Sequence, residues 1–78
     1  MHKPTALIQA RLDLGLTQIE AANAVKLTRQ RYGNIEKSKA GIKLPRAESI
    51  ALCLEAKIEQ LFRKDEKSNR YFAKKFEE

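Results

Sequence analysis

Cysteine and histidine are almost missing from this 78-residue sequence, which has one of each and no tryptophan. Cys53 alone cannot form an intramolecular disulfide, and small secreted domains usually carry several cysteines, so a reducing cytoplasm fits better. One cysteine and one histidine are too few ligands for a metal site. A nucleophilic cysteine would also need a base, and the single histidine, His2, lies at an end of the chain that we expect to fray. We therefore expect no metal, no cofactor and no enzymatic activity, and we expect Cys53 to be a partly buried core residue.

Long apolar runs are missing as well. The longest covers only a few residues, whereas a helix needs roughly 20 to span a bilayer, and residues 1–5 show no signal-peptide pattern. Three glycines and two prolines argue against a loop-rich chain, while 42% hydrophobic residues are typical of a globular domain. We expect one small cytoplasmic domain without a membrane partner, whose thin core a second copy would support.

Acidic residues are nearly missing from residues 26–46, where Glu36 is the single acid among seven lysines and arginines. This segment carries a net charge of +6, equal to that of the whole chain, because the remaining nine bases and nine acids cancel. A basic stripe is typical of proteins that bind a polyanion. A face that is basic only for solubility has the same composition, so charge by itself leaves both interpretations open.

Helical spacing dominates the apolar pattern, and no segment of useful length alternates with period two, so we predict an all-α fold. The predicted helices cover residues 5–14, 17–25, 29–37, 45–54 and 58–62. After a charged stretch, Tyr71, Phe72 and Phe76 recur at helical spacing. They predict a short amphipathic helical tail, or a tail that is ordered only on pairing.

Local signals mark the ends of these helices. Pro4 suits a helix start, and Gly15 can end a helix in the left-handed conformation. Residues 17–20, Thr-Gln-Ile-Glu, form a capping box, and Thr28 is a second candidate N-cap. Gly41 is the expected turn residue of the basic loop after the third helix.

A capped helix, a break of about three residues and a second capped helix follow one another between Gly15 and Glu36. This order predicts a helix-turn-helix, in which the second helix needs an apolar face for anchorage and a polar start that reaches base edges. Tyr32 and Ile35 supply the apolar face, and Arg29-Gln30-Arg31 supplies the polar start.

The same residues resemble a known family. The segments Gly15-Leu16-Thr17-Gln18-Ile19-Glu20-Ala21-Ala22, Leu27-Thr28-Arg29, Ile35-Glu36, Ile50-Ala51 and Ile58-Glu59-Gln60-Leu61-Phe62 are similar to the xenobiotic-response-element, or Cro and phage-repressor-like, helix-turn-helix family. The resemblance implies a five-helix DNA-binding domain in residues 1–62, followed by a C-terminal extension, 63–78, with a possible role in dimerisation. The sequence departs from the family at Lys26 and Ser38, where glycine is usual, at Ala21, where leucine is common, and at Ile42, where proline is common.

Candidate site residues follow from this register. We predict that Arg29, Gln30, Gly33 and Asn34 lie on the exposed side of the third helix and read bases, because arginine grips guanine and glutamine grips adenine in bidentate fashion. The predicted phosphate-binding residues are Gln18, Thr28, Arg31, Lys37, Lys39 and Lys43, with Arg46 as a further candidate. A solvated polar face is the alternative for each set. The resemblance further implies that Gln18 braces the third helix and that Arg11 forms a structural ion pair with Glu36.

The sequence therefore predicts a transcriptional regulator, most simply a repressor, that binds double-stranded DNA at a palindromic operator as a homodimer. Residues 58–76 are the expected pairing surface, although the tail could instead fold back over Leu61 and Phe62. The alternative function is a helical protein-interaction module, such as an antitoxin that binds a toxin, with DNA binding secondary.

Overall fold

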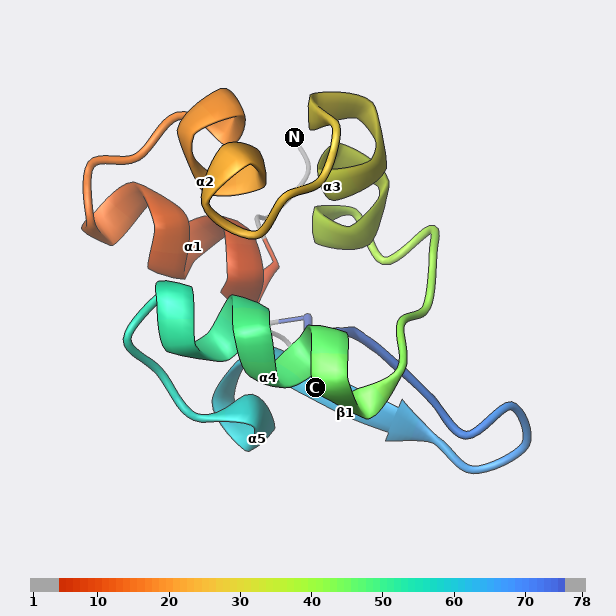
Figure 1. The fold of residues 1–78 in the computed structure, drawn as a ribbon. Coiled ribbons are helices and arrows are strands. Elements are labelled where there is room, and N and C mark those ends of the chain that lie inside the picture. Colours follow the sequence, from red (N-terminus) through yellow and green to blue (C-terminus); the bar gives the residue numbers. More distant parts are fainter. Residues whose placement is uncertain (1–4, 76–78) are drawn as a thin grey trace.

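Five helices followed by a two-stranded hairpin make up the fold in the computed structural model, which describes residues 5–75 (Figure 1). The helices are α1 (Ala6–Asp13), α2 (Gln18–Ala24), α3 (Arg29–Glu36), α4 (Leu44–Cys53) and α5 (Ile58–Leu61). The strands are β1 (Phe62–Asp65) and β2 (Arg70–Ala73). The five predicted helices are confirmed, whereas Pro4 and Phe76 lie outside the described residues.

Threonine side chains start the first three helices. The Thr17 hydroxyl accepts a hydrogen bond from the Glu20 N–H (3.1 Å), while the Glu20 carboxylate accepts one from the Thr17 N–H (2.9 Å). Thr28 caps α3 by accepting from the Arg31 N–H at 3.1 Å. Both predicted caps are therefore present, and each satisfies N–H groups that a helix start leaves without a partner.

The core gathers apolar side chains from all five helices and from both strands. Leu7, Tyr32, Ile35 and Ile50 are among its fully buried members. Cys53 is half-buried and packs against this cluster, as predicted. Because Tyr32 and Ile35 come from one side of α3, the core holds that helix by its apolar face.

The prediction of a purely helical fold with a helical tail is wrong, because residues 62–65 and 70–73 form an antiparallel hairpin. Phe62 pairs with Ala73, and both are buried, while Asp65 pairs with Arg70 at the turn. Each strand has only four residues, and neither alternates in burial, so no period-two signal was available. The hairpin turn is closed by Asp65, whose carboxylate accepts hydrogen bonds from the Ser68 N–H and hydroxyl.

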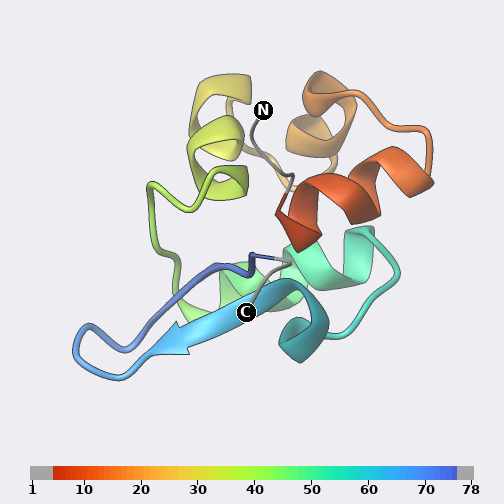
Figure 2. The ribbon, with the colours of Figure 1, turned by 180° about the vertical axis from the view of Figure 1, so that it is seen from behind.

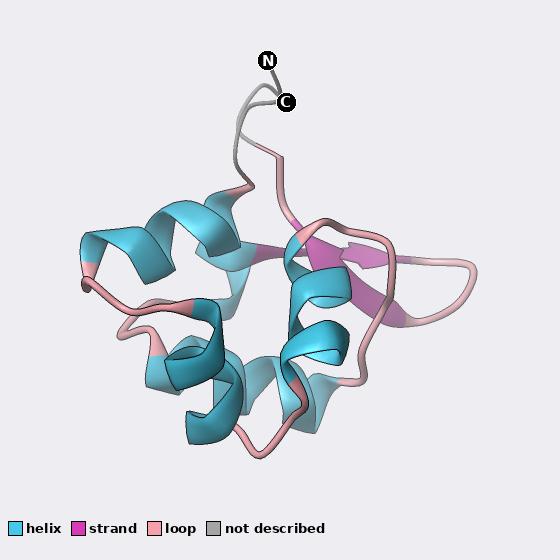
Figure 3. Cartoon of the chain, turned by 90° about the horizontal axis from the view of Figure 1, so that it is seen from above, coloured by secondary structure: helices cyan, strands magenta, loops and turns pink. Residues whose placement is uncertain are grey.

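The hairpin folds back on the helices of its own chain rather than standing apart as a tail. It lies along the outside of α4 and extends beyond the helices on one side (Figures 2 and 3). Strand β2 forms an antiparallel bridge to the loop after α3, in which the Ile42 N–H donates to the Tyr71 carbonyl at 3.0 Å. Proline lacks this N–H, which gives a physical reason for isoleucine at a position where the family commonly has proline.

Gly41 serves a different purpose from the predicted turn. Ser38 takes the left-handed conformation in this loop, with φ of 65°, whereas Gly15 is the glycine with positive φ within residues 5–75. A Cβ atom at Gly41 would lie 2.7 Å from Cζ of Phe72, so the missing side chain lets β2 approach the loop closely. The expectation that Gly41 makes the turn is therefore corrected.

Two positions where the family usually has glycine hold left-handed residues with side chains, namely Lys26 (φ 59°) and Ser38 (φ 65°). The left-handed conformation costs a residue with a side chain roughly 1–2 kcal/mol. Glycine removes this strain, but it also loses more conformational entropy on folding, so only part of the strain energy is gained as stability. We expect Lys26→Gly and Ser38→Gly each to raise the free energy of unfolding by up to about 1 kcal/mol. Urea denaturation measures this. Lys26→Ala and Ser38→Ala are the controls, because they keep the strained backbone, and equal stability of the glycine and alanine variants would contradict the prediction.

Candidate nucleic-acid interface

Helices α2 and α3 pack against each other and are joined by a short turn over residues 25–28. Val25 is buried beneath this turn, and Lys26 reverses the chain direction through its left-handed conformation. The carbonyl of Val25 accepts a hydrogen bond from Nη1 of Arg46 at 3.0 Å, which ties the turn to α4. The predicted helix-turn-helix is thus fixed to the rest of the domain from beneath.

The exposed side of α3 presents polar side chains beside its buried apolar face. Arg29, Gln30 and Asn34 are exposed, as the helical register predicts. Gly33 is not, because it is buried next to α2, where a Cβ atom would lie 3.6 Å from Nε2 of Gln18. The expectation that Gly33 lies on the exposed side is therefore wrong: its position makes it part of the α2–α3 contact, since the helices approach closely there.

A buried carboxylate joins three helices beneath this surface. Glu36, which is 0% exposed, pairs through Oε2 with Nε of Arg11 at 2.5 Å and accepts at Oε1 from Nε2 of Gln18 at 2.9 Å. Arg11 also donates from Nη1 to the Leu16 carbonyl at 2.8 Å, and Thr5 donates its hydroxyl to the Glu36 carbonyl at 2.7 Å. Charge-assisted bonds of this kind fix the orientation of α3 relative to α1 and α2.

Basic side chains surround the exposed side of α3. Arg31 lies on the helix itself, and Lys37, Lys39 and Lys43 follow on the loop, all exposed. Gln18 is half-buried at the start of α2 and braces α3 through Glu36. The structure thus brings the sequence-predicted cations to the surface around α3, where phosphates could be reached.

A further cation comes from the hairpin. Arg70 on β2 donates from Nη1 to the carbonyl of Gly41 at 3.4 Å, so it lies against the loop after α3. No local sequence pattern singles out this residue, because its neighbours in the fold are about thirty positions away in the chain. The bridge between Ile42 and Tyr71 is what places it there.

The Tyr32 hydroxyl is buried and has no hydrogen-bond partner within residues 5–75. Burial raises the pKa of this phenol well above its ordinary value of 10.0, and the nearby Glu36 carboxylate raises it further. Both effects disfavour the phenolate in the folded state.

Tyr32→Phe is expected to raise the free energy of unfolding at pH 7 by about 1 kcal/mol, because it removes a buried polar group that lacks a partner.

In the unsubstituted protein Tyr32 stays protonated in the folded state above pH 10 while it ionises in the unfolded state. Stability therefore falls as pH rises above 10, by at most about 1.4 kcal/mol per pH unit, and Tyr32→Phe should lessen that fall. Denaturant unfolding at pH 7 and pH 11 measures both effects. Tyr71→Phe, at a half-buried position, is the control, and identical pH dependence of the two variants would contradict the assignment.

Other kinds of site find little support in the described part of the chain. No group of three histidine, cysteine, aspartate or glutamate residues within residues 5–75 is arranged to hold a metal ion. None of the helices in that range is both long and apolar enough to cross a lipid bilayer.

Comparison with known proteins assigns the helical part of the chain to a family. A family model for the helix-turn-helix domain matches residues 7–61, which is more than two thirds of the chain. The match covers α2, the turn, α3, α4 and α5, and it ends where the hairpin begins. No curated protein matches the sequence significantly.

Proposed function

Because this chain belongs to the helix-turn-helix family of the xenobiotic-response-element, Cro and phage-repressor type, a family of DNA-binding domains, we propose that it is a sequence-specific transcriptional repressor. It binds a palindromic operator in double-stranded DNA as a homodimer. The observation that carries this proposal is the way α3 is held. Glu36 and the core fix the helix on its buried side. The polar side chains on its other side stay exposed, namely Arg29, Gln30 and Asn34.

Base recognition falls to the exposed side chains of α3. Arg29 donates two hydrogen bonds to O6 and N7 of a guanine, and Gln30 or Asn34 forms the corresponding pair with N6 and N7 of an adenine. A reading helix must enter the major groove in one fixed orientation, since a bidentate contact tolerates little misalignment. The buried network around Glu36 supplies that fixed orientation.

Phosphate contacts position the domain without reading sequence. We assign them to Gln18 and Thr28 at the starts of α2 and α3, to Arg31, and to Lys37, Lys39 and Lys43. The concentration of the positive charge around α3 supports this assignment, because the same segment carries a net charge of +6. Its cations would draw any duplex to the reading helix.

Homodimerisation follows from the small number of base contacts that one α3 can make. Such a contact set discriminates poorly among competing genomic sites, and two copies on half-sites about 34 Å apart double it. We assign the pairing surface to residues 58–76 apart from Arg70, whose side chain lies against the loop after α3 and not toward a partner copy. Sedimentation of the intact chain tests the dimer, and a monomer in the presence and absence of operator would contradict it. Truncation is unsuitable here, because removal of β2 would expose the core that Ala73 closes.

Selection of bound sequences from a pool of random duplexes tests the function itself. We expect a two-fold symmetric site, with affinity for it that exceeds affinity for random duplex and falls as salt rises. Placing that site over a promoter should then lower transcription when the protein is added. Absence of salt-dependent duplex binding would favour the alternative, a protein-interaction module such as an antitoxin.

A further inference from the structure

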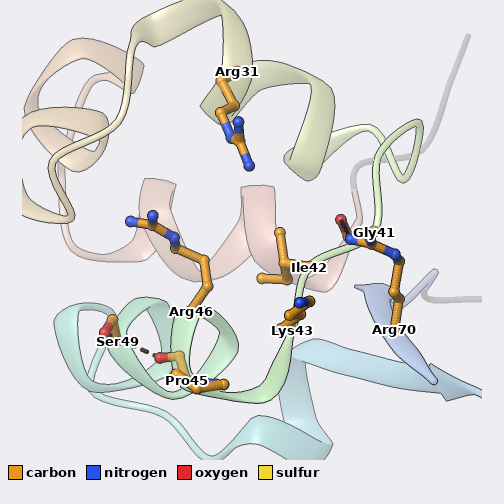
Figure 4. Close-up of a pocket in the computed structure, with 8 residues that line it drawn as sticks. All are labelled: Arg31, Gly41, Ile42, Lys43, Pro45, Arg46, Ser49 and Arg70. Atoms are coloured by element: carbon orange, nitrogen blue, oxygen red, sulfur yellow. Dashed lines mark hydrogen bonds between the residues drawn. The ribbon is translucent and has the colours of Figure 1, made fainter.

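A strongly basic hollow of about 520 Å³ lies between α3, the loop after it, the start of α4 and strand β2 (Figure 4). Arg31 extends into it from α3 and Arg46 from α4, so that the two side chains reach into the same space from opposite sides. Lys43 and Arg70 complete its charged lining. We refer to this feature as the basic hollow.

Four cations line the basic hollow, and no carboxylate does. Within residues 5–75 none of the four takes part in an ion pair; the pair found there joins Arg11 to Glu36. Like charges brought together in this way repel one another, and an anion bound among them removes that repulsion. The hollow is therefore suited to a group with concentrated negative charge, such as a phosphate.

Two of the arginines are already held in place. Arg46 donates from Nη1 to the Val25 carbonyl at 3.0 Å, and Arg70 donates from Nη1 to the Gly41 carbonyl at 3.4 Å. A guanidinium group has five N–H donors in a planar fork, so each arginine keeps donors for an anion. Holding the fork in advance lowers the entropy lost when the anion binds.

The positive surface continues along the hairpin. A second hollow of about 420 Å³ shares Lys43 and Arg70 with the first and adds Lys64. Residues 62–75 contain six lysines and arginines and two acids, which gives this segment a net charge of +4. This local charge is not evident from the sum over all residues outside 26–46, which is zero. The basic surface around α3 thus extends onto an element outside the family match, which ends at residue 61.

We propose that the hairpin is a second DNA-contacting element, in which Arg70 binds a backbone phosphate of the duplex in the basic hollow together with Arg31 and Arg46. The inference rests on the proposed function, since it requires a duplex seated on α3. Arg31 connects the two surfaces, because it lies three positions before the exposed Asn34, on the same side of α3, and also lines the hollow. The contact reads no bases; it lengthens the duplex that one protomer covers and adds to the salt dependence of binding.

Fluorescence anisotropy with a random-sequence duplex, over a series of salt concentrations, tests the proposal. For Arg70→Gln we expect the slope of log affinity against log salt to fall in magnitude by about 0.9 per bound protomer, the change for one lost phosphate contact. Arg70→Lys, which keeps the charge, should keep most of the slope. Lys57→Gln is the matched control: it removes one charge at the start of α5, and its slope should equal that of the unsubstituted protein.

A second arm separates duplex phosphate from a free anion. Inorganic triphosphate is titrated into the unsubstituted protein and into Arg70→Gln, while NMR follows the arginine side-chain signals and the amides of Ile42 and Tyr71. Retained protection of the Ile42 and Tyr71 amides from hydrogen exchange in Arg70→Gln establishes that the bridge to β2 is intact. An Arg70-dependent response to triphosphate, combined with an unchanged duplex slope, would overturn the proposal in favour of a free-anion site.

Equal slopes for Arg70→Gln and Lys57→Gln would also overturn it. That result leaves the proposed function standing as long as the unsubstituted protein still prefers its selected site. Failure of the unsubstituted protein to bind any duplex would instead contradict the proposed function, so the two failures are distinguishable.

Discussion

Replacing Glu36 by alanine is expected to lower the free energy of unfolding by about 3–5 kcal/mol, the largest effect on stability that we expect from a single substitution here. The Glu36 carboxylate is fully buried and neutralises Arg11, which is only 9% exposed. Without it, a charged guanidinium stays in the interior with no opposite charge, and the Gln18 amide loses its acceptor. Thermal and urea unfolding measure the loss.

Exposed and conservative variants make this test specific. Glu48→Ala removes an exposed acid from α4 and should change stability by no more than about 0.5 kcal/mol. Glu36→Gln retains an acceptor for Gln18 but not the charge, so its stability should lie between those of the other two. Combining Glu36→Ala with Arg11→Met should cost less than the sum of the single changes, because no unpaired charge remains. Unchanged stability in Glu36→Ala would refute the structural role of the pair.

Arg29→Ala is expected to cost about 1–3 kcal/mol of binding free energy at each half-site of the selected operator, and to relax the preference at one base pair there. In a homodimer both half-sites lose the contact, so the loss is counted twice for the whole operator. The exposed position of Arg29 at the start of α3 leaves the core unchanged, so the loss should appear in binding and not in stability.

Lys39→Ala is the matched control for Arg29→Ala, because both remove one exposed positive charge near α3. It should weaken binding to all duplexes similarly, since a phosphate contact carries no sequence information. Competition assays with duplexes that vary one base pair at a time distinguish the two patterns. If both variants lost equal affinity on specific and random DNA, α3 would not be the reading helix.

The helices and their caps were predictable because each depends on residues close together in the chain. Thr17 and Glu20 are three positions apart, as are Thr28 and Arg31, and these pairs form the caps in the structure. The order of a capped helix, a break and a second capped helix was enough to predict the helix-turn-helix, and the matched family agrees. Lys26 retains the turn although glycine is usual, because the cost of its left-handed conformation is small beside the packing of α2 on α3.

The contact between Arg11 and Glu36 joins residues 25 positions apart, and the sequence indicated it only through a solitary acid among bases and through family resemblance. The roles of two glycines were less accessible still. Gly33 belongs to the α2–α3 contact and Gly41 to the contact with Phe72, and neither neighbour lies within one turn of helix in sequence. A single sequence shows that a glycine is present, but not which distant atoms lie beside it, nor that the contact with Phe72 leaves too little room for a side chain at Gly41 whereas the contact at Gly33 does not.

The hairpin is the part that only the tertiary structure decided. Its strands have four residues each, too few for a periodic pattern. Tyr71 and Phe72 lie in strand β2, so the helix that the spacing of the aromatic residues predicted there does not form. What forms the strands is the pairing of Phe62 with Ala73 and the bridge from Tyr71 to Ile42, both of which satisfy backbone groups across the chain. The local sequence was sufficient for the helices and for the surface that α3 exposes, because helical hydrogen bonds and caps are local. The position of Arg70 beside Arg31 and Arg46 depends on non-local backbone pairing, which became visible only in the folded chain.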